Sequence, residues 1–426
     1  NNVSVNGEAP LSLTLDGKGH QSYQCLSKRA PDESHEFTWK EVTTTRGGEL
    51  AEILGDQLRS VDSLVVKGYV NDKDFHAMWD ASLYGYLSVI NLKNAVLENN
   101  AVPDTAFFHE NEQYEGSSHE IFYYIGLRKI ILPEGLEKIG EGAFYQASAL
   151  RQVNFPSTLR YIGDFAFNAT KLEMNQLVIP EGVEEINQYA FAFCRKLKAQ
   201  VTLPSTIKKI GEWAFYGCPI TSINLPEGLE SLGSLAFWDC DLREVSIPSS
   251  CHEFNEGWQF GFNRNLEKMH LPEGMTEIPD HFAVDCFRLR EVNFPHTLKH
   301  IGEKAFSLCI SLKDVELPLG MQSLGEEAFS ELEALEQIVF PASMKSLGKN
   351  SCAYWKNIKR IYCAAMEPPV CDPTDGGVFS GFDFPDGLNT PVVYIPKGTI
   401  NKYKDTSRNC MGWEKFWNYV EIDPSE

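Results

Sequence analysis

Short segments in which apolar and polar residues alternate recur along most of the chain, and each ends at a proline. In one copy the apolar residues Val292 and Phe294 alternate with polar neighbours, which predicts a short strand with one buried face. Pro295 ends that strand because proline has no N–H to donate to a ladder. The prolines that mark the ten copies are Pro133, Pro156, Pro180, Pro204, Pro226, Pro248, Pro272, Pro295, Pro318 and Pro341.

The second half of each copy has fixed spacing. An apolar residue stands six residues after the proline, Ile301 in the copy above, and four residues later most copies carry Ala-Phe, here Ala305-Phe306. A small residue at that point lets backbones approach, and the ring fills the interior. Gly302 permits a sharp turn, and the segment after Ala-Phe is expected to form a 3₁₀ or single helical turn.

Successive marking prolines are 22 to 24 residues apart. This period predicts a solenoid, in which each copy forms one coil and the coils stack. The fold class is therefore a β-rich solenoid of about ten coils with a cap at each end. Every change of length falls between Ala-Phe and the next proline, where the gap is 12 to 14 residues. That edge is the one expected to tolerate variation.

The residues after the proline alternate between two kinds. A glycine stands there in one copy and a small or hydroxyl-bearing pair in the next, as in Glu134-Gly135 and Ser157-Thr158. The alternation indicates that the chain grew by pairs of coils. We interpret a Gly turn beside a Ser/Thr turn as relief of crowding between neighbours.

The pattern divides the chain into four predicted segments. Residues 1–48 form a β-rich leader with a hairpin-like signal, residues 49–126 an N-terminal cap with degenerate coils, residues 127–363 the repeat array, and residues 364–426 a C-terminal cap. The residues expected to build the N-terminal cap are a helical set (Leu50, Ile53, Leu54, Leu58), a strand at 63–66, a strand pattern (Leu87, Ile90, Leu92) and a coil-like stretch at 102–107. Those expected to cover the last coil are Trp413, Phe416, Trp417 and Val420.

Charge narrows the classes of partner. The chain has 59 acidic and 38 basic residues and a net charge of −21, which argues against nucleic acid, whose phosphates need a basic surface. It also disfavours docking on anionic lipid. No apolar run reaches the roughly 18 residues that a membrane helix needs. The sequence begins Asn1-Asn2-Val3, and we expect an export signal, with or without a lipid anchor, to have been removed.

Cysteines follow the repeat. Of 11 in the chain, five recur eight residues after the apolar position: Cys194, Cys218, Cys240, Cys286 and Cys309. Periodic placement favours small buried residues over disulfides, although some neighbours would lie within bridging distance. Cys363 and Cys371 lie at the end of the array and are the pair most expected to form a disulfide. There is no zinc-type spacing.

The repeat resembles the BspA-like class of bacterial leucine-rich repeat surface proteins. The motif that carries the resemblance is Leu-x-x-Val-x-Phe-Pro-x-x-Leu-x-x-Ile-Gly-x-x-Ala-Phe-x-x-Cys, as in residues 150–170 and 312–332. It covers roughly residues 127–363. Three coils depart from it. One has Asn255 at the Gly position and Trp258-Gln259 at the Ala-Phe position, and the next has Pro279 and Phe282-Ala283 at these positions. The third has Ser351-Cys352 in place of Ala-Phe.

No motif for catalysis, phosphate or metal binding is present. His270 is expected to point outward from a strand, and the acidic residues Asp372, Asp375, Asp383 and Asp386 have no calcium-loop spacing. No nucleophile stands beside a base at a recognisable spacing. We therefore predict a non-enzyme without cofactor or metal.

The candidate site is a strip of aromatic residues just after Ala-Phe, on the variable edge: Tyr145, Phe193, Tyr216 and Trp238, extended by Phe260 or Phe262. Exposed aromatic strips bind proteins or stack on sugars, but the same rings could instead seal gaps between coils. The resemblance implies an extracellular or cell-surface protein that adheres to host or other extracellular proteins. A surface glycan-binding protein is the alternative. Oligomeric state has no signal in the sequence.

Overall fold

The computed structural model describes residues 24–26, 35–108, 121–123, 125–371, 377–381, 391–405 and 412–423. The hairpin-like signal at Leu11–Gly17 and the four aspartates of the C-terminal loop lie outside these residues. The chain divides into two compact units, Asn1–Ile207 and Lys208–Glu426. Each unit is a parallel β-solenoid, and the two together have about 14 coils, more than the ten copies counted in the sequence. The predicted fold class is confirmed.

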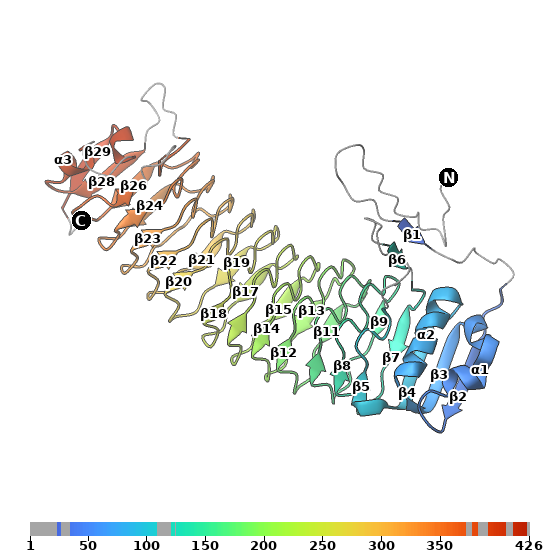
Figure 1. Ribbon diagram of the computed structural model, residues 1–426. Helices are drawn as coiled ribbons and strands as arrows, with labels where there is room; N and C mark the ends of the chain where they lie inside the picture. Colours follow the sequence, from blue (N-terminus) through green and yellow to red (C-terminus); the bar gives the residue numbers. More distant parts are fainter. Residues whose placement is uncertain are drawn as a thin grey trace. The chain divides into compact units, whose positions relative to one another are not determined.

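Most coils have two strands where one was predicted from the sequence. The first is the predicted strand before the proline, and the second is a two-residue strand that ends at the apolar residue six positions later (Figure 1). Strands of the same kind in successive coils pair in parallel, as His300–Ile301 does with Ser323–Leu324. Two residues are too few for the alternation that reveals a strand in a sequence.

In the first unit, the first strands between Trp39 and Thr202 pair in parallel in two separate sheets. The first-strand sheet contains β2 (Trp39–Thr44), β3 (Ser63–Val70), β4 (Val89–Leu97), β7 (Lys129–Ile131) and β9 (Gln152–Val153), and β11 (Gln176–Val178) pairs with β13 (Gln200–Thr202). The second strands are β5 (Ala101–Val102), β8 (Lys138–Ile139), β10 (Tyr161–Ile162) and β12 (Glu185–Ile186). A further pair joins β1 (Gln24–Leu26) to β6 (Ile121–Tyr123).

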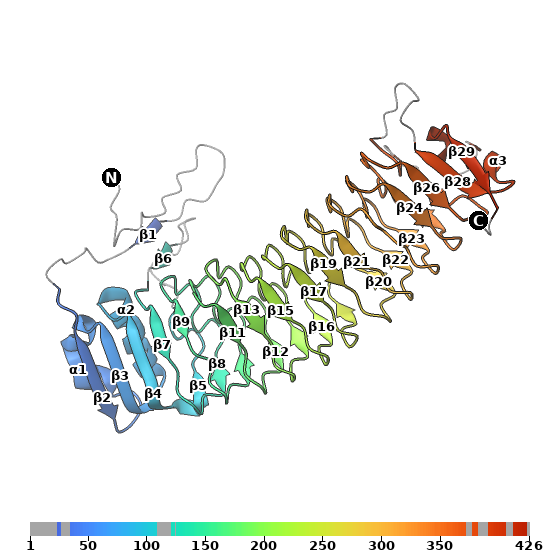
Figure 2. The same ribbon diagram turned by 180° about the vertical axis from the view of Figure 1, so that it is seen from behind.

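In the second unit, the first strands are β15 (Ser222–Asn224) and the strands of two sheets. One sheet contains β17 (Glu244–Ser246), β19 (Lys268–His270) and β21 (Glu291–Asn293). The other contains β24 (Gln337–Phe340), β26 (Arg360–Cys363), β28 (Val392–Pro396) and β29 (Tyr419–Ile422), which lie side by side in Figure 2. The second strands are β14 (Lys209–Ile210), β16 (Ser231–Leu232), β18 (Glu253–Phe254), β20 (Glu277–Ile278), β22 (His300–Ile301), β23 (Ser323–Leu324), β25 (Ser346–Leu347) and β27 (Val370–Cys371). Short helices α3 (Ile400–Tyr403) and η4 (Trp413–Lys415) follow.

The predicted segment boundaries remain predictions, but strand pairing crosses three of them. β2 pairs with β3 across residue 48, β4 with β7 across residue 126, and β26 with β28 across residue 363. At the C-terminal end Trp413 is fully buried and Phe416 nearly so, as predicted. Trp417 and Val420 do not cover the last coil, because they are 77% and 41% exposed.

Helices lie between the early strands of the first unit. The predicted helical set forms α1 (Leu50–Leu54), which buries Leu50 and Leu54 and leaves Ile53 exposed, followed by η1 (Gly55–Ser60). A longer helix, α2 (Asp72–Tyr84), has no counterpart in the sequence analysis; η2 (Glu98–Asn100) is a single turn. Asn71 and Asp74 form a capping box at the start of α2, which is the sequence signal that marks this helix.

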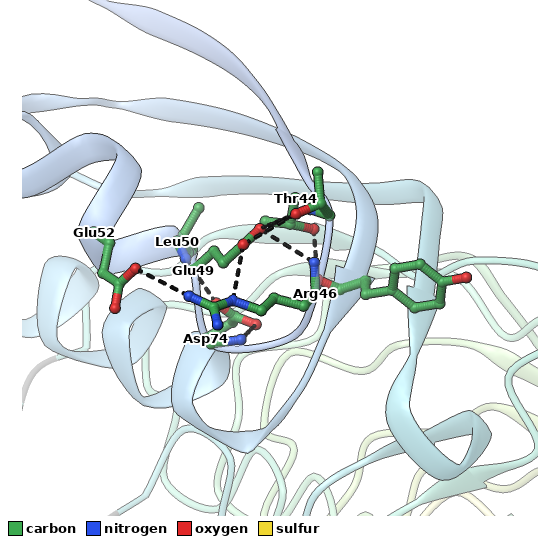
Figure 3. A network of polar contacts seen from close by, with 9 residues as sticks. Thr44, Arg46, Glu49, Leu50, Glu52 and Asp74 are labelled. Carbon is green, nitrogen blue, oxygen red and sulfur yellow. Dashed lines mark hydrogen bonds and ion pairs between the residues drawn. The ribbon is translucent and has the colours of Figure 1, made fainter.

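A polar network ties these helices together (Figure 3). The Asp74 carboxylate is 1% exposed and accepts hydrogen bonds from the backbone N–H groups of Gly48 and Leu50 at 2.7 and 2.9 Å. Glu49 accepts from the Arg46 side chain at 3.0 Å, and Arg46 also reaches Glu52 at 3.7 Å. A buried carboxylate that is so bonded stabilises the loop before α1.

A row of phenylalanine rings fills the interior of each unit, as predicted. In the first unit Phe144, Phe167 and Phe191 stack with centroid separations of 5.2 and 5.3 Å. In the second unit Phe237 stacks on Phe215 and on Phe260, at 5.6 Å in each case. All these rings are fully buried.

The segment after the second strand is not a helical turn, contrary to expectation. Lys304 and Leu308 have left-handed φ values of 50° and 61°. The N–H groups of Lys304 and Leu308 donate to the next coil, to Glu326 O at 2.8 Å and to Ser330 O at 3.0 Å. A helical turn would direct these N–H groups back into its own coil. The segment instead forms a third ladder between coils.

The recurring cysteine position is a hydrogen-bond donor position. The Cys240 Sγ lies 3.3 Å from the carbonyl of Phe215 in the preceding coil. Where cysteine is absent, Asn263 Nδ2 and Trp355 Nε1 donate to the equivalent carbonyls, each at 2.7 Å. The periodic cysteines are buried and free, as predicted. Cys363 and Cys371, the pair most expected to form a disulfide, form none, since both thiols are free and buried.

The alternation after the prolines coincides with a set of hydrogen bonds between neighbouring coils. The Thr158 hydroxyl accepts from the Gly135 N–H at 2.9 Å and donates to the Leu136 carbonyl at 2.7 Å. Gly135 has a φ of 96°, which favours glycine. The same bonds join Gly182 to Thr206, Gly228 to Ser250, and Gly274 to Thr297. Each hydroxyl therefore joins two coils into a pair.

Candidate functional site

The four predicted site residues all lie on turns that follow the buried ring row. Tyr145 and Phe193 belong to the first unit, and Tyr216 and Trp238 belong to the second. Tyr145, Tyr216 and Trp238 directly follow the core ring of their coil, whereas Phe193 stands one residue further on, with a φ of 60°. Phe193 therefore does not occupy the turn position of the other three.

In the first unit the two predicted residues have different surroundings. Tyr145 is half-buried between the rings of Phe108 and Phe165, with edge-on contacts at centroid separations of 4.7 and 5.9 Å. Phe193 is 36% exposed, and the Arg195 guanidinium lies 5.4 Å from its ring centroid.

In the second unit the two predicted residues belong to two separate sets of half-buried rings. Tyr216 packs on Trp213 at 4.4 Å. Trp238 packs on Trp258 at 5.2 Å and on Phe262 at 4.5 Å. We call these five residues the aromatic surface. The rings contact one another, as they would if they sealed gaps between coils. They also remain partly open to solvent, as binding to a partner requires.

Sequence reasoning missed a second aromatic position, directly before the alanine position. It holds Phe165 and Tyr189 in the first unit, whose rings stack at 4.7 Å, and Trp213, Trp258 and His281 in the second. All five have left-handed φ values between 55° and 66°. Their constant offset from Ala-Phe is a signal that the sequence carries.

The irregular coil after Phe254 contains one extra residue. Phe260, not Gln259, stacks in the ring row, and Gln259 occupies the alanine position. The predicted match of Trp258-Gln259 to Ala-Phe is therefore wrong by one residue, because Gly257 is inserted with a φ of 81°. Of the two proposed extensions of the strip, Phe260 is fully buried and Phe262 is at the surface.

The titratable groups of the coils offer no obvious nucleophile. Burial raises the pKa of the Cys251 and Cys286 thiols to about 12 and that of Cys363 to about 11, so these thiols are protonated near neutral pH. His270 points outward as predicted, with its ring 3.4 Å from Glu244. Within the described ranges, no three His, Cys, Asp or Glu side chains are grouped so that they could hold a metal ion. No helix among the same residues is both long and apolar enough to span a bilayer.

Known proteins match the chain through its repeats. The model of the BspA type leucine-rich repeat region matches residues 117–201, 198–307 and 277–366. No curated protein matches significantly.

Two solved structures are among those similar to this chain. A leucine-rich repeat protein from Bacteroides ovatus is 22% identical with a TM-score of 0.51, over 71% of this chain and 79% of that one. A leucine-rich cell surface protein from Faecalibacterium prausnitzii is 16% identical with a TM-score of 0.36, over 84% of this chain and 96% of that one. The first of these supports the fold. Because the family model matches more than half of its residues, the chain belongs to the BspA-type leucine-rich repeat family.

Proposed function

We propose that this protein is a non-catalytic, secreted or cell-surface protein that adheres to another protein through the aromatic surface of its second unit. The observation that carries the proposal is the packing of half-buried rings on Trp238, whose ring centroid lies 5.2 Å from that of Trp258 and 4.5 Å from that of Phe262, on turns bonded to the neighbouring coils. Rigid aromatic side chains supply contact area at low entropic cost and dominate many protein interfaces. Membership of a leucine-rich repeat family supports a protein partner.

A surface location is part of the same proposal. The Faecalibacterium prausnitzii relative is described as a cell surface protein, and the net charge of −21 favours a hydrated surface without nucleic acid. Cell fractionation of the native host, with protease shaving of intact cells, tests the location. Protection from added protease in intact cells would contradict it.

Binding is tested by surface plasmon resonance against a panel of extracellular matrix proteins. The variant Tyr216→Ala with Trp238→Ala is expected to lose at least ten-fold in affinity for any protein that the unmodified chain binds. The matched control is Trp39→Ala with Tyr69→Ala, which removes two exposed rings at the start of the first unit. Equal affinity of the first variant and the unmodified chain rules out the aromatic surface.

Glycan binding is the second candidate, because aromatic faces also stack on the C–H faces of sugars and the rings near Trp238 are partly open. A glycan array distinguishes the two. Saturable binding to a sugar together with silence on the protein panel would replace the first proposal by the second.

A further inference from the structure

The ladder of second strands is interrupted at one place in the second unit. β18 is the last strand of its sheet and β20 is the first strand of the next. The neighbouring pairs are intact, since β16 pairs with β18 and β20 with β22. The other ladders also continue across the break, with β17, β19 and β21 paired and Phe260 N–H bonded to Phe282 O at 2.9 Å.

The sequence supplies the cause. In regular coils the glycine after the second strand donates its N–H to the coil before, as Gly302 does to Ile278 O and Gly325 does to Ile301 O, both at 2.8 Å. Pro279 stands at this position in the coil after the break and has no N–H to donate. The carbonyl of Phe254 therefore loses the donor that its counterparts have.

A second carbonyl at the break is also left open. Thr276 O, in the next coil, accepts from the N–H groups of Lys299 and His300 at 2.9 and 3.2 Å. Its counterpart is His252 O, and within the described part of the chain no backbone N–H bonds to it. Two adjacent backbone acceptors thus face the gap between β18 and β20.

A groove of about 580 Å³ occupies this gap. Four carboxylates line it, from Glu256, Glu273, Glu277 and Asp280, and none of its lining residues is lysine or arginine. Glu273 contacts His296 at 3.1 Å, and Asp280 accepts the Glu303 N–H at 2.6 Å. Among the described residues Glu256 and Glu277 have no such partner. The groove therefore offers carbonyl acceptors and carboxylates, and the His252 imidazole is the one basic side chain among its lining residues.

We infer that this groove binds an arginine side chain of an extended segment of a partner protein. A guanidinium has five N–H donors and no acceptor, and its planar fork can bond a carboxylate and a neighbouring carbonyl at once. The exposed edges of β18 and β20 offer backbone groups to the same segment, as in strand addition. The volume falls within the range of sites that take small ligands or peptide side chains. The residues that line the groove are not those of the aromatic surface, and the inference does not depend on that surface.

The test uses the full chain and a fluorescein-labelled peptide, Ser-Arg-Ser-Arg-Ser, in fluorescence anisotropy at physiological salt. Saturable binding is expected, with at least ten-fold weaker binding of the peptide that carries norvaline for arginine. Glu256→Gln with Glu277→Gln should weaken binding at least ten-fold. The charge-matched control, Glu98→Gln with Glu184→Gln on exposed sites of the first unit, should leave it within two-fold.

A second variant tests the groove without changing charge. Pro279→Gly restores the N–H that regular coils have, and we expect it to close the ladder and weaken binding at least ten-fold, with circular dichroism and thermal unfolding recording whether the fold is kept. If the Pro279→Gly variant unfolds, the comparison of the two glutamine pairs decides whether the groove binds the peptide. The inference is overturned if no saturable binding occurs, if both glutamine pairs weaken binding equally, or if a folded Pro279→Gly variant binds as well as the unmodified chain. Because the probe is a peptide, these outcomes are independent of those on the protein panel.

Discussion

Regular and irregular coils of the second unit differ in how many ladders join them. Between the coils of Ile278 and Ile301 all ladders are present, including the second-strand pair and the Gly302 bond. Between the coils of Phe254 and Ile278 the second strands do not pair. The first strands still pair, and the third ladder, formed by the turns after the second strands, also remains. A solenoid can thus give up one set of bonds locally because its neighbours are held by the others.

The ring row changes at the same place. Phe237 and Phe260 stack nearly parallel at 12°, but Phe260 and Phe282 meet edge-on at 75°. In the coil of Ile278 the large and small residues are exchanged, with Phe282 at the alanine position and Ala283 at the ring position. The interior remains filled by both arrangements, so the difference between the coils lies in hydrogen bonding at one edge and not in loss of core.

The largest expected effect tests that the core is equally filled in both kinds of coil. Phe237→Ala in a regular coil and Phe260→Ala in the irregular one should each lower the free energy of unfolding by about 3–5 kcal/mol, because both rings are fully buried. Urea unfolding followed by circular dichroism measures the loss. The exposed Tyr161→Ala serves as a control. A loss under about 1 kcal/mol for Phe260→Ala would mean that the irregular coil is loosely packed.

The next prediction concerns the inserted glycine. A Cβ at Gly257 would stand 2.0 Å from the Asp280 carbonyl oxygen, and its φ is 81°. Gly257→Ala should therefore cost about 2–5 kcal/mol, from left-handed strain and overpacking together.

The matched control for the inserted glycine lies in the next coil. Gly274 has a φ of 97° and nothing within 4 Å of its Cβ position, so Gly274→Ala should cost only about 1–2 kcal/mol. Equal losses of unfolding free energy in urea titrations of the two variants would show that the contact with Asp280 is not what demands glycine.

This contrast also explains what the sequence could predict. Spacing that is repeated ten times is a strong signal, so the solenoid, the buried rings and the burial of the periodic cysteines were predictable. The second strands were not, because two residues carry no periodicity. The insertion of Gly257 shifted the alignment by one residue and hid the fact that Phe260 is core, since Trp258-Gln259 still filled the expected positions.

The candidate site was predictable only in part, for a similar reason. Tyr216 and Trp238 could be located by their offset from the ring row. Their neighbours Trp213 and Trp258 stand directly before the alanine position. We expected a helical turn in this part of the coil, and that expectation did not say on which side of the coil these two side chains lie. The groove could not be foreseen, because it depends on which carbonyl lacks a donor, and that follows from Pro279 only once the register between coils is known.

A smaller loss of stability is expected at the recurring cysteine position, where Cys240 can be compared with Asn263, the residue that takes the place of cysteine in the irregular coil. Asn263 Nδ2 donates to Phe237 O and to Phe260 O at 2.7 and 2.8 Å, whereas Cys240 offers a weaker thiol donor, 3.3 Å from Phe215 O and 3.9 Å from Trp238 O. Asn263→Ala should lose about 2 kcal/mol of unfolding free energy and Cys240→Ala about 1 kcal/mol. Asn263→Cys tests the equivalence directly and should recover part of the loss. A larger loss for Cys240→Ala than for Asn263→Ala in urea titrations would reverse the assigned roles.

The smallest effect is a pH dependence confined to the irregular region. Burial against Trp258, on which its ring stacks at 3.6 Å, lowers the pKa of His281 below its ordinary 6.5. Below pH 6.5 the unfolded chain therefore binds more protons at this residue than the folded one. The resulting stability is present above pH 6.5 and is lost as the pH falls through the folded pKa. Relative to His281→Gln, which cannot titrate, the unmodified protein should lose urea resistance between pH 7 and pH 5. Parallel curves for the two proteins would show that the imidazole becomes charged as readily in the folded protein as in the unfolded chain, and would contradict the lowered pKa of His281.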